Sequence, residues 1–501
     1  MNDNILHHLK FAAKKAEAKP AFILPGDGSI TYGAFYERVS RLASLLSDMG
    51  LSSGDRLVAQ IDKSLANVAL YLATLQVGAI YVPLNTAYTS TELEYFLGDA
   101  KPVIFVGRSE TLSVIEPIAQ RLGVAHSALL DGDDGLWEQA LLHRPMPEVA
   151  HRRGDDIASI IYTSGTTGRS KGAMLSHENL LHNAKALHKL WGFEPGDTLL
   201  HALPIYHVHG LMVALHTSLL NATPIILLDR FEAETVRQHL PNSTVLMGVP
   251  TFYSRLSALP GFGAEDCRSI RLFTSGSAPL TSQASDAWTE LTGHRILERY
   301  GMSEAGMITS NPYQGDRLAG TVGYPLPEVE LRVADEAGQE LPKGEIGVIE
   351  IKGPNIFRGY WKMEDKTADA FRDDGFFITG DNALQDEDGR VTIVGRAKDL
   401  IISGGLNIYP KEIEQVLDDV PGVLETAIIG TPHADLGEGV VAICVATGEA
   451  LSDETLQSAL QDTIARFKHP RKFYWVESLP RNAMGKVQKA VLRETFKDAY
   501  A

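Results

Sequence analysis

A loop rich in glycine and hydroxyl residues constrains the fold of this chain more than any other feature. It follows the apolar run at residues 157–161 and reads Tyr162-Thr163-Ser164-Gly165-Thr166-Thr167-Gly168-Arg169-Ser170-Lys171-Gly172. The apolar run predicts a buried strand. The glycines allow backbone N–H groups to turn toward one point, and the Ser/Thr hydroxyls and the charges of Arg169 and Lys171 add groups that bind phosphate. We therefore predict a strand that runs into a polyphosphate-binding loop.

The loop could also be interpreted as a P-loop or as a flexible linker. It differs from the pattern G-x-x-x-x-G-K-[ST], because Arg169 follows Gly168 and no hydroxyl residue follows Lys171. A P-loop nucleotide triphosphatase is therefore not predicted. A flexible Gly/Ser/Thr linker would explain the composition, but not two cations placed directly after a buried strand. The linker remains an open alternative from these residues alone.

The composition is typical of an ordinary globular protein. The 501 residues are 44% hydrophobic and 22% charged, which allows roughly two to four domains. Cys267 and Cys444 lie far apart without metal-ligand spacing, so we predict neither a disulfide framework nor a zinc site. The best membrane-span candidate, residues 211–228, is interrupted by polar residues and proline, and the N-terminus lacks a secretory signal. We expect a soluble, cytoplasmic protein without a membrane partner.

The charge distribution restricts the partners. A net charge of −17 argues against nonspecific nucleic-acid binding, which needs a basic surface. We expect no nucleic-acid partner. Basic residues are nevertheless concentrated between Arg466 and Lys497, where nine Lys/Arg face only Glu477 and Glu494. Either a solvated helix face or an anion site would produce this segment.

The first part of the chain predicts a parallel α/β unit. Apolar residues recur at helical spacing at Phe35, Val39, Leu42 and Leu46. Thr31 can cap the start of this helix, and Gly50 can end it. Strands are predicted at residues 57–61, 79–84 and 103–106, with a helix at 64–77. Strands separated by a helix imply a parallel sheet.

A second parallel unit is predicted after the loop. Its expected parts are a helix capped by Ser176, the segment 199–204, the stretch 206–209, and strands at 245–249 and 272–274. A further strand is expected at residues 296–300. Alternation along this strand sends Leu297 and Arg299 to one face, and Glu298 and Tyr300 to the other.

The pattern changes after Arg317. Alternating segments at residues 329–333 and 347–352 predict a small antiparallel β subdomain, which ends at residue 396. A helix at 410–420, with Pro410 at its start, then opens a separate α+β unit.

Five motifs in this order resemble the adenylate-forming enzymes, which include acyl-CoA synthetases, luciferases and the adenylation domains of peptide synthetases. The motifs are the phosphate loop, Tyr300-Gly301-Met302-Ser303-Glu304, Thr379-Gly380-Asp381, Gly395-Arg396-Ala397-Lys398-Asp399 and Asn482-Ala483-Met484-Gly485-Lys486. The resemblance covers almost the whole chain and is greatest to malonyl-CoA synthetases. It implies a large N-terminal domain, residues 1–396, made of two parallel α/β subdomains and a small antiparallel β subdomain. A small mobile α+β domain, residues 397–501, would follow a hinge near Lys398.

The resemblance also implies an AMP-forming acid–thiol ligase. The substrate carboxylate attacks the α-phosphate of ATP to give acyl-AMP and pyrophosphate, and the thiol of coenzyme A then gives acyl-CoA and AMP. Mg²⁺ is the expected cofactor, and a small dicarboxylate is the expected substrate, malonate first and methylmalonate second. No tethered carrier protein is expected, because the sequence ends 15 residues after Lys486 without an acceptor module.

Alternatives to this activity remain open. They are a short-chain or aryl monocarboxylate:CoA ligase, a luciferase-like oxygenating enzyme and a noncatalytic nucleotide-binding module.

By the same resemblance, the nucleotide contacts are expected along the whole chain. They are Thr163, Ser164, Gly165, Thr166, Thr167, Gly168, Lys171, Ser277, Ala278, Glu298, Tyr300, Ser303, Asp381, Arg396 and Lys486. Thr163, Glu304 and Lys486 are the expected catalytic residues. Glu304 would hold Mg²⁺, although an acid in the first turn of a helix is the alternative. Asp381 would bind the ribose, and Lys486 the α-phosphate and the substrate carboxylate.

The acyl pocket and the coenzyme A site are expected from other residues. His207, Val208, Arg299 and Met307 would line the acyl pocket, and Arg299 would bind the free carboxylate of malonate. The alternative for Arg299 is a structural pair with an internal acid. His207 and His209 alone do not predict a metal site. The expected contacts of coenzyme A are Gly404, Gly405, Arg466 and Lys468.

Overall fold

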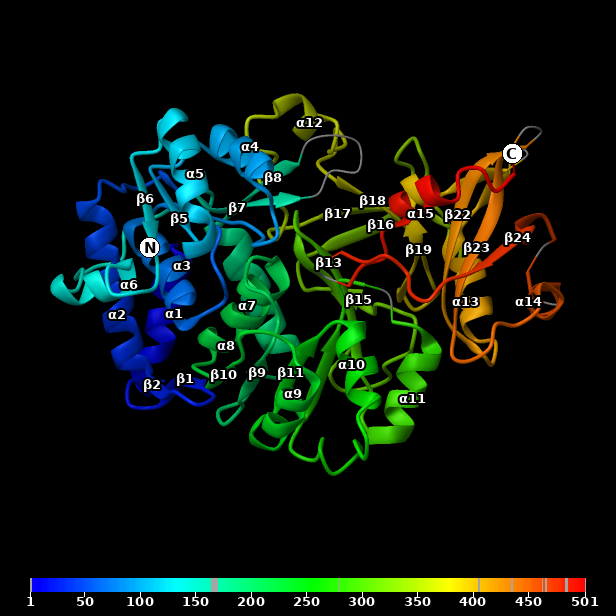
Figure 1. Cartoon of the computed structure of the whole chain (residues 1–501), viewed down its shortest axis with the longest axis horizontal. Helices are drawn as coiled ribbons and strands as arrows, with labels where there is room; N and C mark the ends of the chain where they lie inside the picture. Colours follow the sequence, from blue (N-terminus) through cyan, green and yellow to red (C-terminus); the bar gives the residue numbers. More distant parts are fainter. Residues whose placement is uncertain are drawn as a thin grey trace.

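The computed structural model describes the whole chain except residues 1, 164–169, 279, 404–405, 434–435, 462, 465, 483–484 and 501. Two α/β units, a small antiparallel sheet and a C-terminal domain follow one another along the chain (Figure 1). The first unit is blue to cyan, the second is green, and the orange-to-red C-terminal domain lies at the far end of the long axis from the first unit. The predicted fold class is therefore confirmed.

The first sheet has the strand order β6-β5-β3-β4-β7-β8. Its strands are β3 (Arg56–Ala59), β4 (Ile80–Pro83), β5 (Ile104–Gly107), β6 (His126–Leu129), β7 (Ile157–Thr163) and β8 (Lys171–Ser176). Neighbouring strands are parallel except β7 and β8, which form an antiparallel pair. The strands predicted at 57–61, 79–84 and 103–106 are confirmed. Strand β8 was not predicted. Because β8 pairs with β7, the phosphate loop connects two neighbouring antiparallel strands.

The first four helices of the first unit begin at residues whose side chains cap them. The helices of this unit are α1 (Ile5–Ala13), α2 (Tyr32–Asp48), α3 (Leu65–Val77), α4 (Ser90–Ala100), α5 (Ser109–Arg121) and α6 (Leu136–Gln139). Thr31 caps α2 by accepting a hydrogen bond from Ala34 N–H. Ser64 caps α3 in the same way. The predicted helices after Thr31 and at 64–77 are confirmed.

The second sheet has the order β15-β14-β13-β12-β11-β9-β10-β1-β2. Its strands are β1 (Pro20–Leu24), β2 (Gly28–Thr31), β9 (Leu199–His201), β10 (Ile225–Leu227), β11 (Val245–Gly248), β12 (Leu272–Ser275), β13 (Leu297–Met302), β14 (Gly306–Ser310) and β15 (Tyr324–Pro325). The central strands are parallel and buried, which explains their continuous apolar sequences. The sequence interpretation missed that β1 and β2, from the start of the chain, complete this sheet.

Helices α7 (His177–Leu190), α8 (Leu215–Leu220), α9 (Ala233–His239), α10 (Pro250–Ser257) and α11 (Ser282–Thr292) belong to the second unit. Ser176 caps α7, as predicted, and forms a reciprocal capping box with Asn179. A π-helix, η3 (His209–Ala214), runs directly into α8. Short 3₁₀ helices are η1 (Lys14–Ala16), η2 (Ala140–Leu142), η4 (Leu240–Asn242), η5 (Ala397–Asp399) and η6 (Arg466–Lys468).

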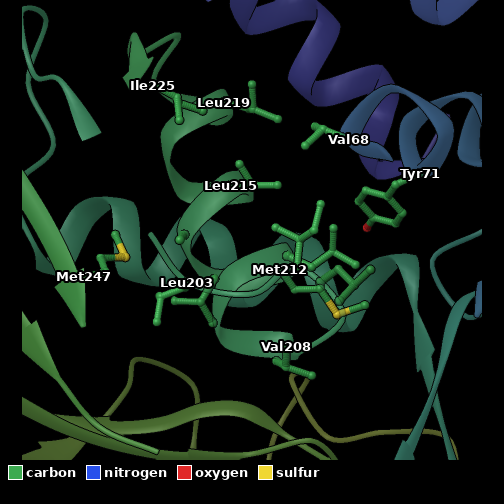
Figure 2. Packing of buried hydrophobic residues seen from close by; sticks show 14 of the residues in the cluster. Val68, Tyr71, Leu203, Val208, Met212, Leu215, Leu219, Ile225 and Met247 are labelled. Carbon is green, nitrogen blue, oxygen red and sulfur yellow. The ribbon is translucent and has the colours of Figure 1, made fainter. Parts of the chain in front are cut away.

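One apolar core runs through both α/β units. Figure 2 shows Val68 and Tyr71 of α3 beside Leu215 and Leu219 of α8. Tyr71 also hydrogen-bonds His216 Nε2 at 2.8 Å. Burial of one leucine side chain stabilises the fold by roughly 1.5–3 kcal/mol, so this shared core fixes how the two units meet.

The small antiparallel sheet and the C-terminal domain complete the chain. The sheet has the order β16-β17-β18-β19, and helix α12 (Glu364–Ala368) lies between β17 and β18 in sequence. Its strands are β16 (Glu330–Ala334), β17 (Gly347–Lys352), β18 (Phe377–Gln385) and β19 (Val391–Arg396). The predicted segments 329–333 and 347–352 are confirmed as strands.

The C-terminal domain is an α+β unit with its own apolar clusters. It contains β20 (Ile401–Ser403), β21 (Leu406–Ile408), α13 (Pro410–Asp418), β22 (Val423–His433), β23 (Gly437–Ala446), α14 (Asp453–Gln461), β24 (Lys472–Trp475) and α15 (Lys489–Thr495). Helix α13 begins with Pro410, as predicted. Within the described residues, no helix is long and apolar enough to cross a membrane.

Candidate functional site

The turn between β13 and β14 places Glu304 at the centre of the candidate site. Glu304 is buried, and burial raises the pKa of its carboxyl group. It lies in a turn, so the interpretation as an acid in the first turn of a helix is wrong. Gly301 and Gly306 allow this tight hairpin: a Cβ on Gly301 would lie 2.2 Å from the carbonyl oxygen of Gly306. Ser303 precedes Glu304 in the same turn.

Tyr360 connects Glu304 to the end of the phosphate loop. Its hydroxyl donates to Glu304 Oε1 at 3.1 Å, and Lys171 Nζ lies 4.2 Å from the centre of its ring. Thr163 pairs with Lys171 across β7 and β8, and the Thr163 hydroxyl donates to the Lys171 carbonyl at 3.3 Å. The structure therefore brings together Thr163, Lys171 and Glu304. The predicted contacts Ser164, Gly165, Thr166, Thr167 and Gly168 lie outside the described residues.

Asp381 forms a second cluster beside Glu304. Arg396 lies 2.7 Å from Asp381 Oδ1, and the Tyr300 hydroxyl donates to Asp381 Oδ2 at 2.5 Å. Burial and the neighbouring Asp381 carboxylate raise the pKa of Tyr300 well above its ordinary value. Arg396 also lies close enough to Glu304 to favour its ionised form. The buried carboxylate of Asp381 thus has two partners that hold its orientation.

Glu298 and Arg299 lie on opposite faces of β13, as predicted from strand alternation. Glu298 is buried, and its Oε1 accepts from Gly320 N–H at 2.9 Å. Burial raises the pKa of Glu298 to about 8. Arg299 is 2% exposed. One strand therefore presents an acid to one side and a buried cation to the other.

Arg299 has polar neighbours but no carboxylate among the described residues. Its Nη2 lies 2.5 Å from His209 Nε2, while Nε and Nη1 have no hydrogen-bond partner within the described part of the chain. No ion pair of the described residues contains Arg299, so the interpretation as a structural pair with an internal acid is wrong. Burial lowers the pKa of Arg299 to about 10, at which it remains protonated near neutral pH.

The backbone at Gly276 packs tightly against the Arg299 guanidinium group. A Cβ on Gly276 would lie 2.1 Å from Arg299 Nη1. The next residue, Ser277, adopts a φ of 67° and lies 3.4 Å from His209 Nδ1 through its hydroxyl. Ala278 follows it in the same loop. The predicted nucleotide contacts Ser277 and Ala278 therefore lie in the loop that packs against Arg299.

Residues 207–209 lead into the π-helix η3 and lie close to Arg299. His209 N–H donates to His207 Nδ1 at 3.2 Å. Burial, then the charges of Arg299 and Lys486, lower the pKa of His207 to about 4, so its imidazole is neutral near pH 7. Val208 belongs to the apolar cluster of Figure 2, and Met307 packs against Gly301. Both side chains are almost fully buried.

Lys486 comes from the C-terminal domain but lies near the same groups. Desolvation, then the charge of Arg396, lower the pKa of Lys486 to about 8, and Asp381 opposes these effects. The preceding residue, Gly485, faces Thr251 of α10, because a Cβ on Gly485 would lie 3.3 Å from Thr251 Oγ1. The charge of Lys486 also lowers the pKa of His207, so the lysine interacts electrostatically with both the Asp381 cluster and the residues around Arg299.

Two of the four residues predicted for the coenzyme A site, Arg466 and Lys468, lie in the short helix η6. Arg466 is exposed in η6, and Lys468 Nζ forms an ion pair with Glu412 Oε2 at 2.6 Å. Gly404 and Gly405 lie outside the described residues. Lys398 lies in η5, between β19 and β20. The roles of these residues stay predictions.

Family comparison places this arrangement among known enzymes. The model of the AMP-binding enzyme family matches residues 9–361, and that of the AMP-binding enzyme C-terminal domain matches residues 412–486. The chain belongs to the AMP-binding enzyme family. This AMP-binding enzyme is 34% identical over 513 residues to "Malonate--CoA ligase ACSF3, mitochondrial" of Xenopus laevis, with 94% of this chain and 88% of that protein covered.

Solved structures support the same assignment. ATP-bound MatB from Rhodopseudomonas palustris is 49% identical, covers 100% of both chains and superposes with a TM-score of 0.97. The apo structure of that protein, at the same identity and coverage, gives a TM-score of 0.88. This AMP-binding enzyme is thus arranged more like the ATP-bound structure than the apo structure.

Two features of the site were missed from sequence. Tyr360 was missed because it lies 56 positions from Glu304 in sequence and no motif marks it. The contact of His209 with Arg299 was also missed, because the two residues are 90 positions apart. Among the described residues, no group of three or more His, Cys, Asp or Glu side chains could hold a metal ion.

Proposed function

We propose that this enzyme joins malonate to coenzyme A, using ATP and forming malonyl-AMP as the intermediate. The observation that carries the proposal is Arg299, a buried guanidinium without a carboxylate partner among the described residues. A buried charge is costly unless it is paired, so a substrate with a second carboxylate would supply the missing partner. The relative from Xenopus laevis is named a malonate–CoA ligase, which supports the same substrate.

In the first step, the two carboxylates of malonate would have different partners. Arg299 would bind the carboxylate that does not react, with His207 as a neutral neighbour. Lys486 would stabilise the reacting carboxylate and the α-phosphate, where negative charge approaches negative charge. Asp381 would accept hydrogen bonds from the ribose hydroxyls, because a carboxylate can accept from both. Thr163 and Lys171 would bind the β- and γ-phosphates.

Glu304 fits a Mg²⁺ site that also uses phosphate oxygens and water as ligands. It is a buried carboxylate, oriented by Tyr360 and close to Lys171. Mg²⁺ commonly binds one or two protein carboxylates together with substrate phosphates. When bound, the ion would neutralise charge on the phosphates.

In the second step, we propose that the C-terminal domain, residues 397–501, rotates relative to residues 1–396 about Lys398. Lys486 faces the nucleotide cluster in this arrangement, and Gly404, Gly405, Arg466 and Lys468 would come into use for coenzyme A only after the rotation. One segment cannot present Lys486 and a thiol channel in a single pose.

The hinge proposal predicts different effects of Lys398→Pro on the two steps. Lys398 lies in a 3₁₀ helix, whose φ angles suit proline, so the adenylation arrangement should tolerate the change. We expect pyrophosphate exchange within about 3-fold of wild type and thioester formation slowed at least ~10-fold, since proline prevents the backbone rotation. Lys398→Ala, which removes the charge but keeps the backbone free, is the control. Equal losses in both steps for Lys398→Pro would contradict a hinge at this position.

Gly276→Ala provides a second test, because the added methyl group would collide with Arg299. The expected result is a fall of at least ~10-fold in kcat/KM for malonate, as the guanidinium is displaced. Acetate, which needs no second carboxylate contact, should lose much less. Gly263→Ala is the matched control, since its Cβ would lie 3.6 Å from the nearest atom. Equal losses for malonate and acetate would indicate a general disturbance of the site.

A panel of acids tests the function itself. Malonate, methylmalonate, acetate, propionate and benzoate should be assayed with ATP and coenzyme A, with AMP and the thioester both measured. We expect malonate to give the highest kcat/KM. Preference for a monocarboxylate would overturn the proposal in favour of a monocarboxylate:CoA ligase.

A further inference from the structure

We infer that Lys63 is a positioning residue for recognition of the second substrate carboxylate, acting through the tautomer of His201. Lys63 lies in the first α/β unit, between β3 and α3, and His201 ends β9 of the second unit. This inference rests on the proposed malonate activity and identifies residues outside the pocket that would determine its selectivity.

Among the described residues, both hydrogen-bond contacts of the Lys63 ammonium or amine nitrogen are with one histidine. Its Nζ donates to the His201 carbonyl oxygen at 2.8 Å and lies 2.9 Å from His201 Nδ1. No ion pair of the described residues contains Lys63. Nε2 of His201 faces the Gly210 carbonyl oxygen at 3.0 Å and must donate to it, so Nδ1 carries no proton and accepts from the Lys63 amine. His201 is 1% exposed, and a neutral imidazole that accepts at Nδ1 carries its proton on Nε2.

The Nε2 proton of His201 reaches the first turn of the π-helix. Nε2 lies 3.0 Å from the Gly210 carbonyl oxygen, so it donates to that oxygen. The same oxygen accepts from Leu215 N–H, which is the i to i+5 bond of the π-helix. The opposite tautomer of His201 would set two acceptors against each other, because Nε2 would face the carbonyl without a proton. By donating to Nδ1, Lys63 therefore stabilises the tautomer that supports this turn.

Gly210 connects the first turn of the π-helix to the proposed acyl pocket. It directly follows His209, whose Nε2 lies 2.5 Å from Arg299 Nη2. A Cβ on Gly210 would lie 2.1 Å from the Pro204 carbonyl oxygen, so the segment 204–210 has little freedom to adjust. A shift of the Gly210 carbonyl would therefore move His209 and change the place of the Arg299 guanidinium. Lys63 reaches neither the phosphate loop nor the Asp381 cluster in any contact of the described residues.

Lys63→Met tests this inference, since methionine keeps the length and removes the donors. We expect KM for malonate to rise about 10-fold, with kcat at saturating malonate, KM for ATP and kcat/KM for acetate each within about 3-fold of wild type. Lys63→Arg, which keeps donors, should restore most of the malonate affinity. An unchanged KM for malonate, or an equal loss for acetate, would overturn the inference.

A double-mutant cycle tests the route through His201. The side-chain amide of His201→Gln can reach the place of Nε2 and donate to Gly210 without any tautomer, whereas His201→Asn is too short to do so. We expect His201→Gln to retain a lower KM for malonate than His201→Asn, and Lys63→Met to add less than about 2-fold in the His201→Gln background. If Lys63→Met raised KM for malonate by the same factor in the His201→Gln background as in wild type, Lys63 would not act through His201.

These variants remain informative if Lys63→Met does not fold. The comparison of His201→Gln with His201→Asn is made in chains that keep Lys63, and equal KM values for malonate in the two would overturn the inference. A wild-type enzyme that does not prefer malonate would instead contradict the proposed function. A malonate-selective wild type with an unaffected Lys63→Met variant would contradict only the role of Lys63.

Discussion

Lys486→Ala is expected to lower the rate of acyl-adenylate formation at least ~100-fold while leaving ATP binding largely intact. Lys486 interacts electrostatically with both Asp381 and His207, and we propose that its ammonium group lies between the α-phosphate and the reacting carboxylate. Removing a charge placed where negative charge develops lowers turnover more than it lowers binding. The other proposed nucleotide contacts all lie before residue 397 and should remain in place.

Pyrophosphate exchange measures this step, and calorimetry measures ATP binding. Lys497→Ala is the matched control, because Lys497 lies in the same domain and, among the described residues, forms an ion pair only with the exposed Glu494. Thioester formation from supplied malonyl-AMP should be affected less than adenylation. Exchange at a near wild-type rate in Lys486→Ala would show that this lysine is not at the reacting centre.

The pH dependence of adenylation provides an independent check on Lys486. Its pKa is lowered to about 8, and a lysine is charged below its pKa. We therefore expect kcat/KM for malonate to fall as the pH rises through about 8, because the free enzyme loses the ammonium form. The descending limb should be absent from the residual activity of Lys486→Ala. A limb that persists unchanged in the variant would assign the titration to another group.

Local sequence signals predicted most of the fold. Thr31 and Ser176 cap their helices as expected, because capping depends on residues only three positions apart. The pairing of β1 with β10 was missed, since strands about 200 residues apart meet only through the tertiary fold. Strand β8 was missed because its polar start, Lys171, was assigned to the phosphate loop alone.

The site was predictable where a motif or an alternation carried it. Strand alternation placed Glu298 and Arg299 on opposite faces, and the structure confirms that placement. Tyr360 and His201 act through contacts across 56 and 138 residues of sequence, with Glu304 and Lys63 respectively. No periodicity links residues at such separations, so only the folded chain could reveal these contacts.

Arg299→Ala is expected to lower kcat/KM for malonate at least ~30-fold, because one partner of a buried charge pair would be lost. Arg299 is 2% exposed, its Nε and Nη1 have no partner among the described residues, and its side-chain hydrogen-bond contact there is with His209. Free enzyme must therefore leave donors of this guanidinium unsatisfied by the protein, and a second carboxylate could accept two hydrogen bonds from them.

Acetate and propionate distinguish this role from a structural one. They lack the second carboxylate, so their kcat/KM should change far less in Arg299→Ala, and the ratio of malonate to acetate activity should collapse. Arg295→Ala is the matched control, because Arg295 is an exposed arginine just before the same strand. Arg299→Lys should recover only part of the malonate activity, since an ammonium cannot make the bidentate contact. If Arg299→Ala weakens all acids alike, Arg299 supports the pocket rather than the second carboxylate, and the malonate proposal loses the observation that carries it.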